Sequence, residues 1–337
     1  MKYSLLLLFT ILIISCNSAQ NAASKAKKMD RTDYASTITA EDLKTHLYIY
    51  ASDEMQGRMT GSKGQKMAAE YLRNFYKSEG IASPNKEIDY YQNIPASYFK
   101  GRAEQDSENV VAYIKGSEKP DELIVLSAHL DHVGVDDNGN VFNGADDDGS
   151  GTVALLEIAQ AFQKAVRDGN GPKRSILFLH VTGEEIGLFG SQYYTENPLF
   201  PLANTVCNLN TDMIGRIDPK KKGNSNYIYL IGSDKLSQEL HEVSEAANST
   251  YTQLELDYTF NDEDDPNRFY YRSDHYNFAK NDIPVIFYFN GTHEDYHQIS
   301  DTPDKIEYEL MQKRTELIFQ TAWEIANREG RITADKL

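Results

Sequence analysis

Residues 122–166 read ELIVLSAHLDHVGVDDNGNVFNGADDDGSGTVALLEIAQAFQKAV, and this stretch decides the fold. It begins with an apolar, β-branched run at 122–128, continues through a polar loop, and ends in apolar residues with helical spacing at 152–166. A buried strand followed by a loop and a helix is the repeating unit of α/β proteins. We therefore expect a sheet with helices packed against it.

Apolar and amphipathic runs repeat this unit along the chain. The expected strands are 87–93, 109–115, 122–128, 174–181, 205–210, 227–231 and 284–289. The expected helices are one that opens at Thr39 and others at 63–79, 152–166, 235–247 and 305–327. The alternation predicts an α/β fold with a mostly parallel, mixed, twisted sheet and helices on both faces. No internal linker divides it, so 36–337 is expected to be one domain.

The composition excludes some classes of function. The 337 residues include 51 acidic and 34 basic side chains, which gives a net charge of −17. Such a chain has no excess of basic residues to neutralise phosphates, so nucleic-acid binding is not expected. With two cysteines a disulfide framework is also excluded. We expect Cys207 to be a buried thiol.

The first residues resemble a targeting segment rather than part of the fold. An apolar run after Lys2 predicts a signal peptide at 1–15, and Ile13-Ile14-Ser15-Cys16 resembles a bacterial lipobox. Cys16 would then carry lipid, and 16–35 would be a polar linker. The protein would be anchored in the bacterial envelope, facing the periplasm, and would touch the membrane only through this lipid. The alternative is a plain secretory signal with a chance cysteine.

Histidines and carboxylates follow the expected strands. Open α/β sheets bind ligands beyond the carboxyl ends of their strands. The candidate side chains at these ends, and at the start of the 152–166 helix, are His129, Asp131, Asp146, Asp147, Asp148, Glu184, Glu185, Asp212 and His297. Their convergence at one edge predicts a metal site.

The residue types narrow the choice of metal. Two histidines and three carboxylates without a thiolate suit zinc, and also manganese or cobalt, better than calcium. Five or more ligands favour two ions that share a bridging carboxylate, as in two-metal hydrolases. Three carboxylates and one hydroxide also balance the charge of two divalent ions, which lowers the cost of burial.

Each group has another interpretation when it is taken singly. Asp146–Asp148 could be a cluster that caps a helix N-terminus, and Glu184-Glu185 could be a solvated pair. His129 could be a hydrogen-bonded core histidine. Their shared position after strands favours the metal site.

The motifs HLDHVG, NGADDDGSG, TGEEIGLFGS, TDMIG and YHQISDT together resemble the M28 family of zinc aminopeptidases. The resemblance runs from about residue 43 to 327 and implies the zinc-dependent exopeptidase fold. The short interval between residues 91 and 109 leaves no room for the protease-associated insert of larger relatives.

The resemblance also implies roles for the candidate residues. His129 and Asp212 would hold one zinc, Glu185 and His297 would hold the other, and Asp147 would bridge them. The family has a cis peptide after the bridging residue, here between Asp147 and Asp148.

Three further residues would act in catalysis. Glu184 would be the general base, which takes a proton from the attacking water and delivers it to the leaving amine. Asp131 would accept a hydrogen bond from the imidazole of His129 and fix its tautomer. Tyr296 matches an oxyanion-binding tyrosine of some relatives, and a packing aromatic is the alternative.

Other polar residues remain ambiguous. Asp274 lies in a segment, 272–275, that resembles one beside the family's substrate pocket, so it would support a ligand. His132, His180 and His293 are expected to be structural or solvent-facing. The acidic stretch 261–265 could bind calcium, attract a substrate amine or be a solvated loop.

The implied function is metal-dependent hydrolysis of N-terminal peptide bonds in peptides with a free N-terminus. One alternative is a glutaminyl cyclase-like enzyme with a single zinc. Those enzymes carry an insertion after the double glutamate and lack the GADDDGSG form. The other alternative is a metal-stabilised binding lipoprotein without catalysis, which would not require Glu184. The preferred N-terminal residue and the oligomeric state stay open.

Overall fold

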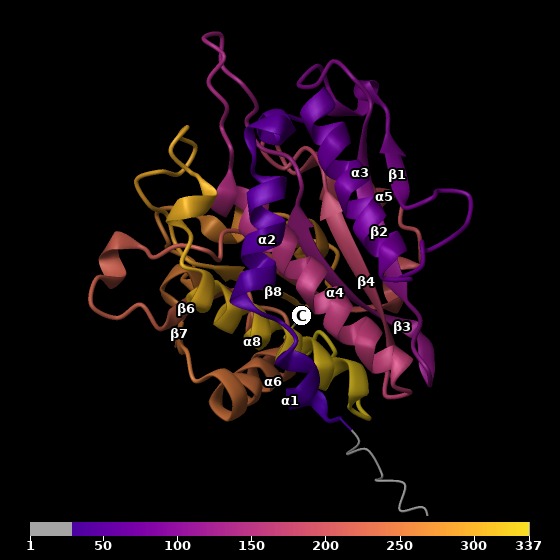
Figure 1. Cartoon of the computed structure of the whole chain (residues 1–337). Coiled ribbons are helices and arrows are strands. Elements are labelled where there is room, and N and C mark those ends of the chain that lie inside the picture. Colours follow the sequence, from indigo (N-terminus) through magenta and orange to yellow (C-terminus); the bar gives the residue numbers. More distant parts are fainter. Residues whose placement is uncertain (1–28, 337) are drawn as a thin grey trace, which may run out of the picture.

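The computed structural model describes residues 29–336, which form one sheet covered by helices (Figure 1). The strand order is β1-β2-β4-β3-β5-β8-β6-β7. The strands are β1 (Tyr91–Ile94), β2 (Ser107–Ile114), β3 (Lys119–His129), β4 (Arg174–Val181), β5 (Thr205–Thr211), β6 (Tyr227–Ile231), β7 (Glu255–Asp257) and β8 (Val285–Phe289). The central strands β4, β3, β5 and β8 are parallel, while β1, β2 and β6 pair in antiparallel fashion with β2, β4 and β8. The predicted mixed, mostly parallel sheet is confirmed.

Helices cover both faces of this sheet. They are α1 (Arg31–Ala35), α2 (Ala40–Tyr50), α3 (Lys63–Ser78), α4 (Gly151–Arg167), α5 (Phe189–Glu196), α6 (Gln238–Ala247), α7 (His275–Ala279) and α8 (Tyr308–Asn327). Successive strand residues point to opposite faces. Leu126 therefore joins the core under α4 and α8, whereas Val125 joins a second core with Tyr194 of α5 and Phe278 of α7.

Local sequence signals set most boundaries. Thr39 caps α2 by accepting a hydrogen bond from the Asp42 N–H at 3.0 Å, and Ser62 caps α3 in the same way. The strand expected at 87–93 is wrong in its first half. There the Asn85 side chain accepts from the N–H groups of Glu87 and Ile88, which folds the chain into turns before β1.

The ordered domain begins before the boundary expected at residue 36. Tyr34 in α1 is buried and stacks on Trp323 of α8, with ring centroids 5.5 Å apart. Arg31 forms an ion pair with Glu324 at 2.6 Å. The expected linker 16–35 is therefore too long at its C-terminal end. The predicted signal peptide and Cys16 lie outside the described residues.

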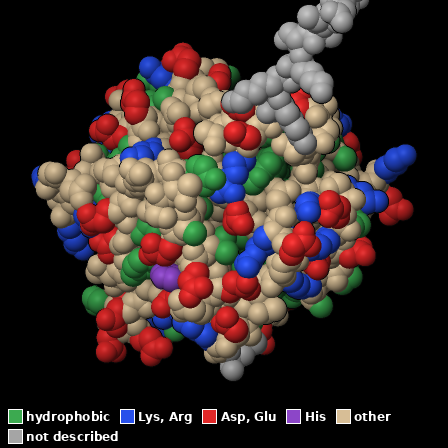
Figure 2. Space-filling model, turned by 90° about the horizontal axis from the view of Figure 1, so that it is seen from below, with side chains coloured by type: hydrophobic (Ala, Val, Ile, Leu, Met, Phe, Trp, Pro, Cys, Tyr) green, Lys and Arg blue, Asp and Glu red, His purple; other side chains and the backbone are tan. Residues whose placement is uncertain are grey.

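The described surface agrees with the acidic composition. In Figure 2 acidic side chains are spread over the visible face and are interspersed with basic ones. Within residues 29–336, none of the helices has the length and apolar character to cross a bilayer. Cys207 is a free, buried thiol as expected, and burial raises its pKa to about 12.

Candidate metal centre

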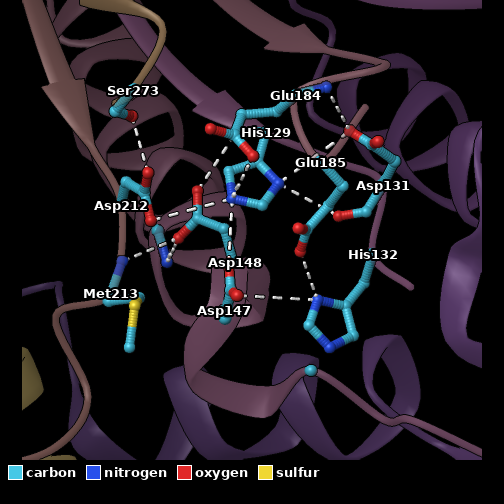
Figure 3. Close-up of polar contacts among 12 residues, drawn as sticks. His129, Asp131, His132, Asp147, Asp148, Glu184, Glu185, Asp212, Met213 and Ser273 are labelled. Atoms are coloured by element: carbon cyan, nitrogen blue, oxygen red, sulfur yellow. Dashed lines mark hydrogen bonds and ion pairs between the residues drawn. The ribbon is translucent and has the colours of Figure 1, made fainter. Parts of the chain in front are cut away.

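The sheet brings the expected ligands to one edge. His129 is the last residue of β3, and Asp212 directly follows β5. Glu185 follows β4, and His297 lies in the loop after β8. Because these strands are parallel, their carboxyl ends meet at the same edge of the sheet. Figure 3 shows the side chains of His129, Glu185 and Asp212 pointing toward one another.

Asp147, from the turn before α4, lies at the centre. Its Oδ1 is 3.0 Å from His129 Nε2, and its Oδ2 is 2.9 Å from His297 Nε2. His129 Nε2 is also 3.7 Å from Asp212 Oδ1, and His297 Nε2 is 3.0 Å from Glu185 Oε2. The structure thus brings all five expected ligands together. One oxygen of Asp147 faces His129 and the other faces His297.

Burial and charge in this cluster favour a cation. Burial alone would raise the pKa of Asp147, but His129 and His297 hold that pKa well below its usual range. Burial raises the pKa of Glu184 well above its usual range, and the charges of Glu185 and Asp212 raise it further. A divalent ion would offset this concentration of carboxylates.

The donor atoms fit zinc. The ligand atoms of His129, Asp147 and Asp212 lie within 4.8 Å of one another. Two further groups meet the same limit: His132, Asp147 and Glu185, and His129, Glu184 and Glu185. Asp147 Oδ2 and His297 Nε2 are buried and lie 2.9 Å apart, yet neither makes a hydrogen bond. Nitrogen and oxygen atoms that converge without forming hydrogen bonds to each other are typical of metal ligands.

The cis peptide expected between Asp147 and Asp148 is present. Asp148 turns away from the centre and accepts hydrogen bonds from backbone N–H groups. These come from His129 at 3.0 Å, Gly151 at 2.9 Å and Met213 at 3.1 Å. Asp148 therefore ties the ends of β3 and β5 to the start of α4.

The carboxylate of Asp146 also points away from the centre and forms structural hydrogen bonds. It accepts hydrogen bonds from the Gly215 N–H at 2.6 Å and from His293 Nε2 at 3.0 Å. His293 is therefore structural, one of the two alternatives expected for it. Of the three consecutive aspartates, only Asp147 directs its carboxylate to the histidines of the centre.

Two residues that sequence reasoning missed hold this turn. The buried Arg58 donates to the carbonyl oxygens of Asn143 at 2.7 Å and Gly144 at 2.9 Å. The carboxylate of Asp301 accepts from the N–H groups of Asp146 and Asp147. Asp301 lies in the motif YHQISDT, whereas the polar segment around Arg58 gave no signal that it would be buried.

Asp131 is beside His129, and it accepts the predicted hydrogen bond through its backbone oxygen rather than its carboxylate. His129 Nδ1 lies 3.0 Å from the backbone oxygen of Asp131 and 3.9 Å from its carboxylate. The carboxylate instead accepts from Thr60 Oγ1 at 2.8 Å and from the Glu184 N–H at 3.2 Å. Asp131 therefore orients His129 through its backbone and Glu184 through its side chain.

His132 differs from its expected structural or solvent-facing role. It is buried, and its Nδ1 lies 2.8 Å from Oε1 of Glu185 (Figure 3). His297 contacts the other oxygen, Oε2. His180, by contrast, is a buried structural histidine whose Nε2 lies 2.7 Å from the Tyr76 hydroxyl.

Asp274 does not contact a predicted ligand. Its neighbour Ser273 donates to Asp212 Oδ2 at 2.6 Å, while Asp274 accepts from the Ser191 hydroxyl. Burial raises the pKa of Asp274 to about 7. The segment expected beside the substrate pocket is in place, but Ser273 supports the ligand.

A recess opens beside the centre. Its lining combines carboxylates with aromatic side chains: Asp147, Glu184, Asp212, Met213, Phe269, Arg272, Phe287, Phe289, Thr292 and Tyr296. Tyr296 also stacks on His297, with ring centroids 3.9 Å apart. Its position is compatible with both the packing and the oxyanion-binding interpretation.

The acidic stretch 261–265 lies apart from this centre. Asp265 accepts from the N–H groups of Asn267 and Phe269, and Asp262 accepts from the Asp264 N–H. These bonds close local turns. Within residues 29–336, no group of possible metal ligands includes the stretch.

Comparison with known proteins places this geometry in context. The sequence model of Peptidase family M28 matches residues 109–322. A probable leucine aminopeptidase of Arthroderma otae is 25% identical over 297 residues, which cover 85% of this chain and 76% of that protein. For the first three curated relatives that the chain matches, the matched segment spans only 19%, 18% and 14% of their length.

Solved structures share the fold. The Legionella pneumophila LapA aminopeptidase has a TM-score of 0.69 at 20% identity, covering 98% of this chain and 81% of that one. A Bacteroides thetaiotaomicron glutaminyl cyclase has a TM-score of 0.64 at 19% identity, covering 87% of this chain and 99% of that one. At these identities the likeness shows the fold alone, so the chemistry must be argued from the site.

Proposed function

Since the chain belongs to peptidase family M28, we propose that it is a zinc aminopeptidase that hydrolyses the first peptide bond of peptides with a free N-terminus. The observation that carries this proposal is the position of Asp147 between two sets of ligands, with Glu184 beside them in the same recess. Two ions at Asp147, a base at Glu184 and the adjacent recess would together meet the needs of peptide hydrolysis.

The proposal assigns two zinc ions to the centre. His129 and Asp212 would hold one, Glu185 and His297 would hold the other, and Asp147 would bridge them. When bound, the zinc pair supplies Lewis acidity that polarises the peptide carbonyl and its attacking water. Ser273 fixes Asp212 through the bond to Oδ2, and the Asp131 backbone oxygen fixes the His129 ring.

Glu184 is the proposed general base. Its Oε2 lies 3.9 Å from His129 Nε2, and its backbone is held by Asp131. Glu185, the next residue, contacts His297 and His132 instead. Glu184 would take the proton of the attacking water and deliver it to the leaving amine, because it is the carboxylate in the recess without a ligand role.

A substitution of Glu184 tests this role. E184Q keeps the size of the side chain but removes its basicity, so we expect two bound zinc ions per chain and a loss of turnover of roughly 100-fold or more. Metal analysis and hydrolysis of leucine p-nitroanilide would be measured, with the N-acetylated substrate as the control for a free amine. Turnover that survives in E184Q would rule out Glu184 as the base.

Glutaminyl cyclase activity is the second candidate, because one enzyme of that name shares the fold. The loop after the double glutamate argues against it. Here the Gly187 N–H donates to the backbone carbonyl oxygen of Glu184 at 2.8 Å, and α5 begins at Phe189. No insertion therefore follows the two glutamates. Release of ammonia from N-terminal glutamine peptides, without hydrolysis of aminoacyl substrates, would favour the cyclase. A non-catalytic binding protein would take up zinc and turn over neither substrate.

A further inference from the structure

An arginine lies at the recess beside the centre. Arg272 follows the short 3₁₀ turn Phe269–Tyr271 and lines the same recess as Asp147 and Glu184. Its guanidinium carbon lies 5.0 Å from the ring centroid of Phe269, which is also part of the recess wall. The aromatic ring thus supports the guanidinium plane at the recess and restricts where its N–H groups can point.

Arg272 has no acidic partner among the residues that the structure describes. It makes no ion pair and no side-chain hydrogen bond with any residue in 29–336. Arg216, on another loop of the same edge, is by contrast paired with Asp295 at 2.8 Å. Among the described residues that line the recess, Arg272 is the only lysine or arginine. Its hydrogen-bonding capacity is therefore available to a molecule that enters the recess.

The chemistry of the recess indicates what such a molecule carries. The carboxylates Asp147, Glu184 and Asp212 line the recess, where they would attract metal ions and a substrate amine. Met213, Phe287 and Phe289 provide apolar wall for a side chain. A guanidinium fork matches the two oxygens of a carboxylate, which is the anionic group that a peptide offers.

We propose that Arg272 is a specificity-determining residue that binds a carboxylate of the peptide substrate. The inference rests on the proposed peptidase function. The carboxylate has two sources: the side chain of an N-terminal aspartate or glutamate, or the C-terminal carboxylate of a dipeptide. In both cases the aromatic wall holds the rest of the residue while Arg272 pairs with the acid.

Matched substrates test the proposal and separate the two sources. The first arm compares glutamyl with glutaminyl p-nitroanilide, which differ only in the side-chain carboxylate. The second compares the dipeptide Leu-Leu with its C-terminal amide. Charged hydrogen bonds of this kind change binding by roughly tenfold or more. We expect the zinc-loaded wild type to prefer the acid in at least one arm by that factor in kcat/KM, and R272Q to lose the preference.

The chain offers a matched control nearby. Arg268 packs on Tyr271, with its guanidinium carbon 4.8 Å from the ring centroid, and does not line the recess. R268Q should keep the wild-type preference, while R272K should retain part of it because the charge remains. Equal acid-to-amide ratios in wild type and R272Q in both arms would overturn the proposal.

A binding measurement keeps this test independent of turnover. Glutarate carries carboxylates but has no peptide bond, so its affinity can be measured by calorimetry on the zinc-loaded protein. R272Q should bind glutarate roughly tenfold more weakly than wild type and R268Q. Weaker binding together with no hydrolysis of any substrate would contradict the proposed function but support Arg272. Hydrolysis with equal glutarate affinities and equal acid-to-amide ratios would support the proposed function but contradict the role of Arg272.

Discussion

At the scale of single residues, the three consecutive aspartates 146–148 have the same side chain but different roles. The direction of each side chain decides its role, because Asp147 faces His129 and His297 while Asp148 faces backbone N–H groups. The sequence alone leaves open whether such a cluster binds metal or caps a helix. In the fold, the Asp148 carboxylate accepts from the first N–H of α4, so the capping interpretation holds for one aspartate of the three.

Substituting these aspartates separately should give different defects. D147N should lose most zinc, because the bridging carboxylate would serve both ions. D148N should instead destabilise the zinc-free protein by about 1–3 kcal/mol, since its amide NH₂ would face a backbone N–H donor. Zinc stoichiometry and urea denaturation would be measured on both variants. Equal loss of zinc in the two would contradict this division.

His132 and His297 contact opposite oxygens of Glu185, and their substitution separates a ligand from a positioning residue. H297Q should bind only one zinc per chain. H132Q should still bind two, but with affinity for the second reduced roughly 10- to 100-fold, because Glu185 loses the partner that orients it. Zinc titration against a competing chelator gives both numbers. If H132Q lost the second ion entirely while H297Q kept it, the assignment of the two histidines would be reversed.

The candidate site was predictable where a residue follows a strand. His129, Glu184, Glu185 and Asp212 each come within four residues of a strand end, so the parallel topology alone predicts that they meet. Arg58 has no such signal. It acts through a fold-dependent contact with a loop 85 residues away along the chain, and no local pattern encodes that contact.

At the scale of elements, apolar runs predicted the long central strands, and periodicity predicted the long helices. β4 and β6 have the predicted bounds, since they are buried along their whole length. The edge strand β7 was missed because its three residues are partly exposed and carry no apolar run. α7 was missed because five residues are too short to show a helical period.

Strand β4 carries a buried histidine that should make stability depend on pH. Burial lowers the pKa of His180 to about 3, so the folded state stays unprotonated where the unfolded chain takes up a proton. Stability from this group is therefore lost as pH falls below about 6.5, by up to about 1.4 kcal/mol per pH unit. Between pH 7 and pH 5, H180Q should lose about 2 kcal/mol less unfolding free energy than wild type.

Urea denaturation at several pH values on the zinc-free proteins would measure this difference. Y76F is the matched control, because it removes the hydroxyl that contacts His180 Nε2 but leaves the imidazole in place. It should lower stability at every pH and keep the wild-type slope. Parallel curves for H180Q and wild type would show that His180 does not contribute to the pH dependence.

At the scale of the whole molecule, the described N-terminus lies far from the recess. α1 is fixed to the last turns of α8 by the contacts of Arg31 with Gln320 and Glu324. Arg174, the first residue of β4, donates to the carbonyl oxygens of Ile325 and Arg328 at the same end of α8. α1 therefore lies near the amino ends of the parallel strands, whereas the metal centre lies at their carboxyl ends.

This arrangement suits the proposed anchor, because a lipid on Cys16 would hold the domain by the edge opposite the recess. We expect C16A to move from the membrane to the soluble fraction after expression in a bacterial envelope, since the acyl chains supply the membrane affinity. The released protein should keep the kcat/KM of the anchored form on small aminoacyl substrates. Fractionation with immunodetection, followed by the p-nitroanilide assay, measures both. A C16A chain that has lost its signal peptide and still sediments with membranes would contradict lipid anchoring at this cysteine, and lower activity on release would mean that the tether influences the site.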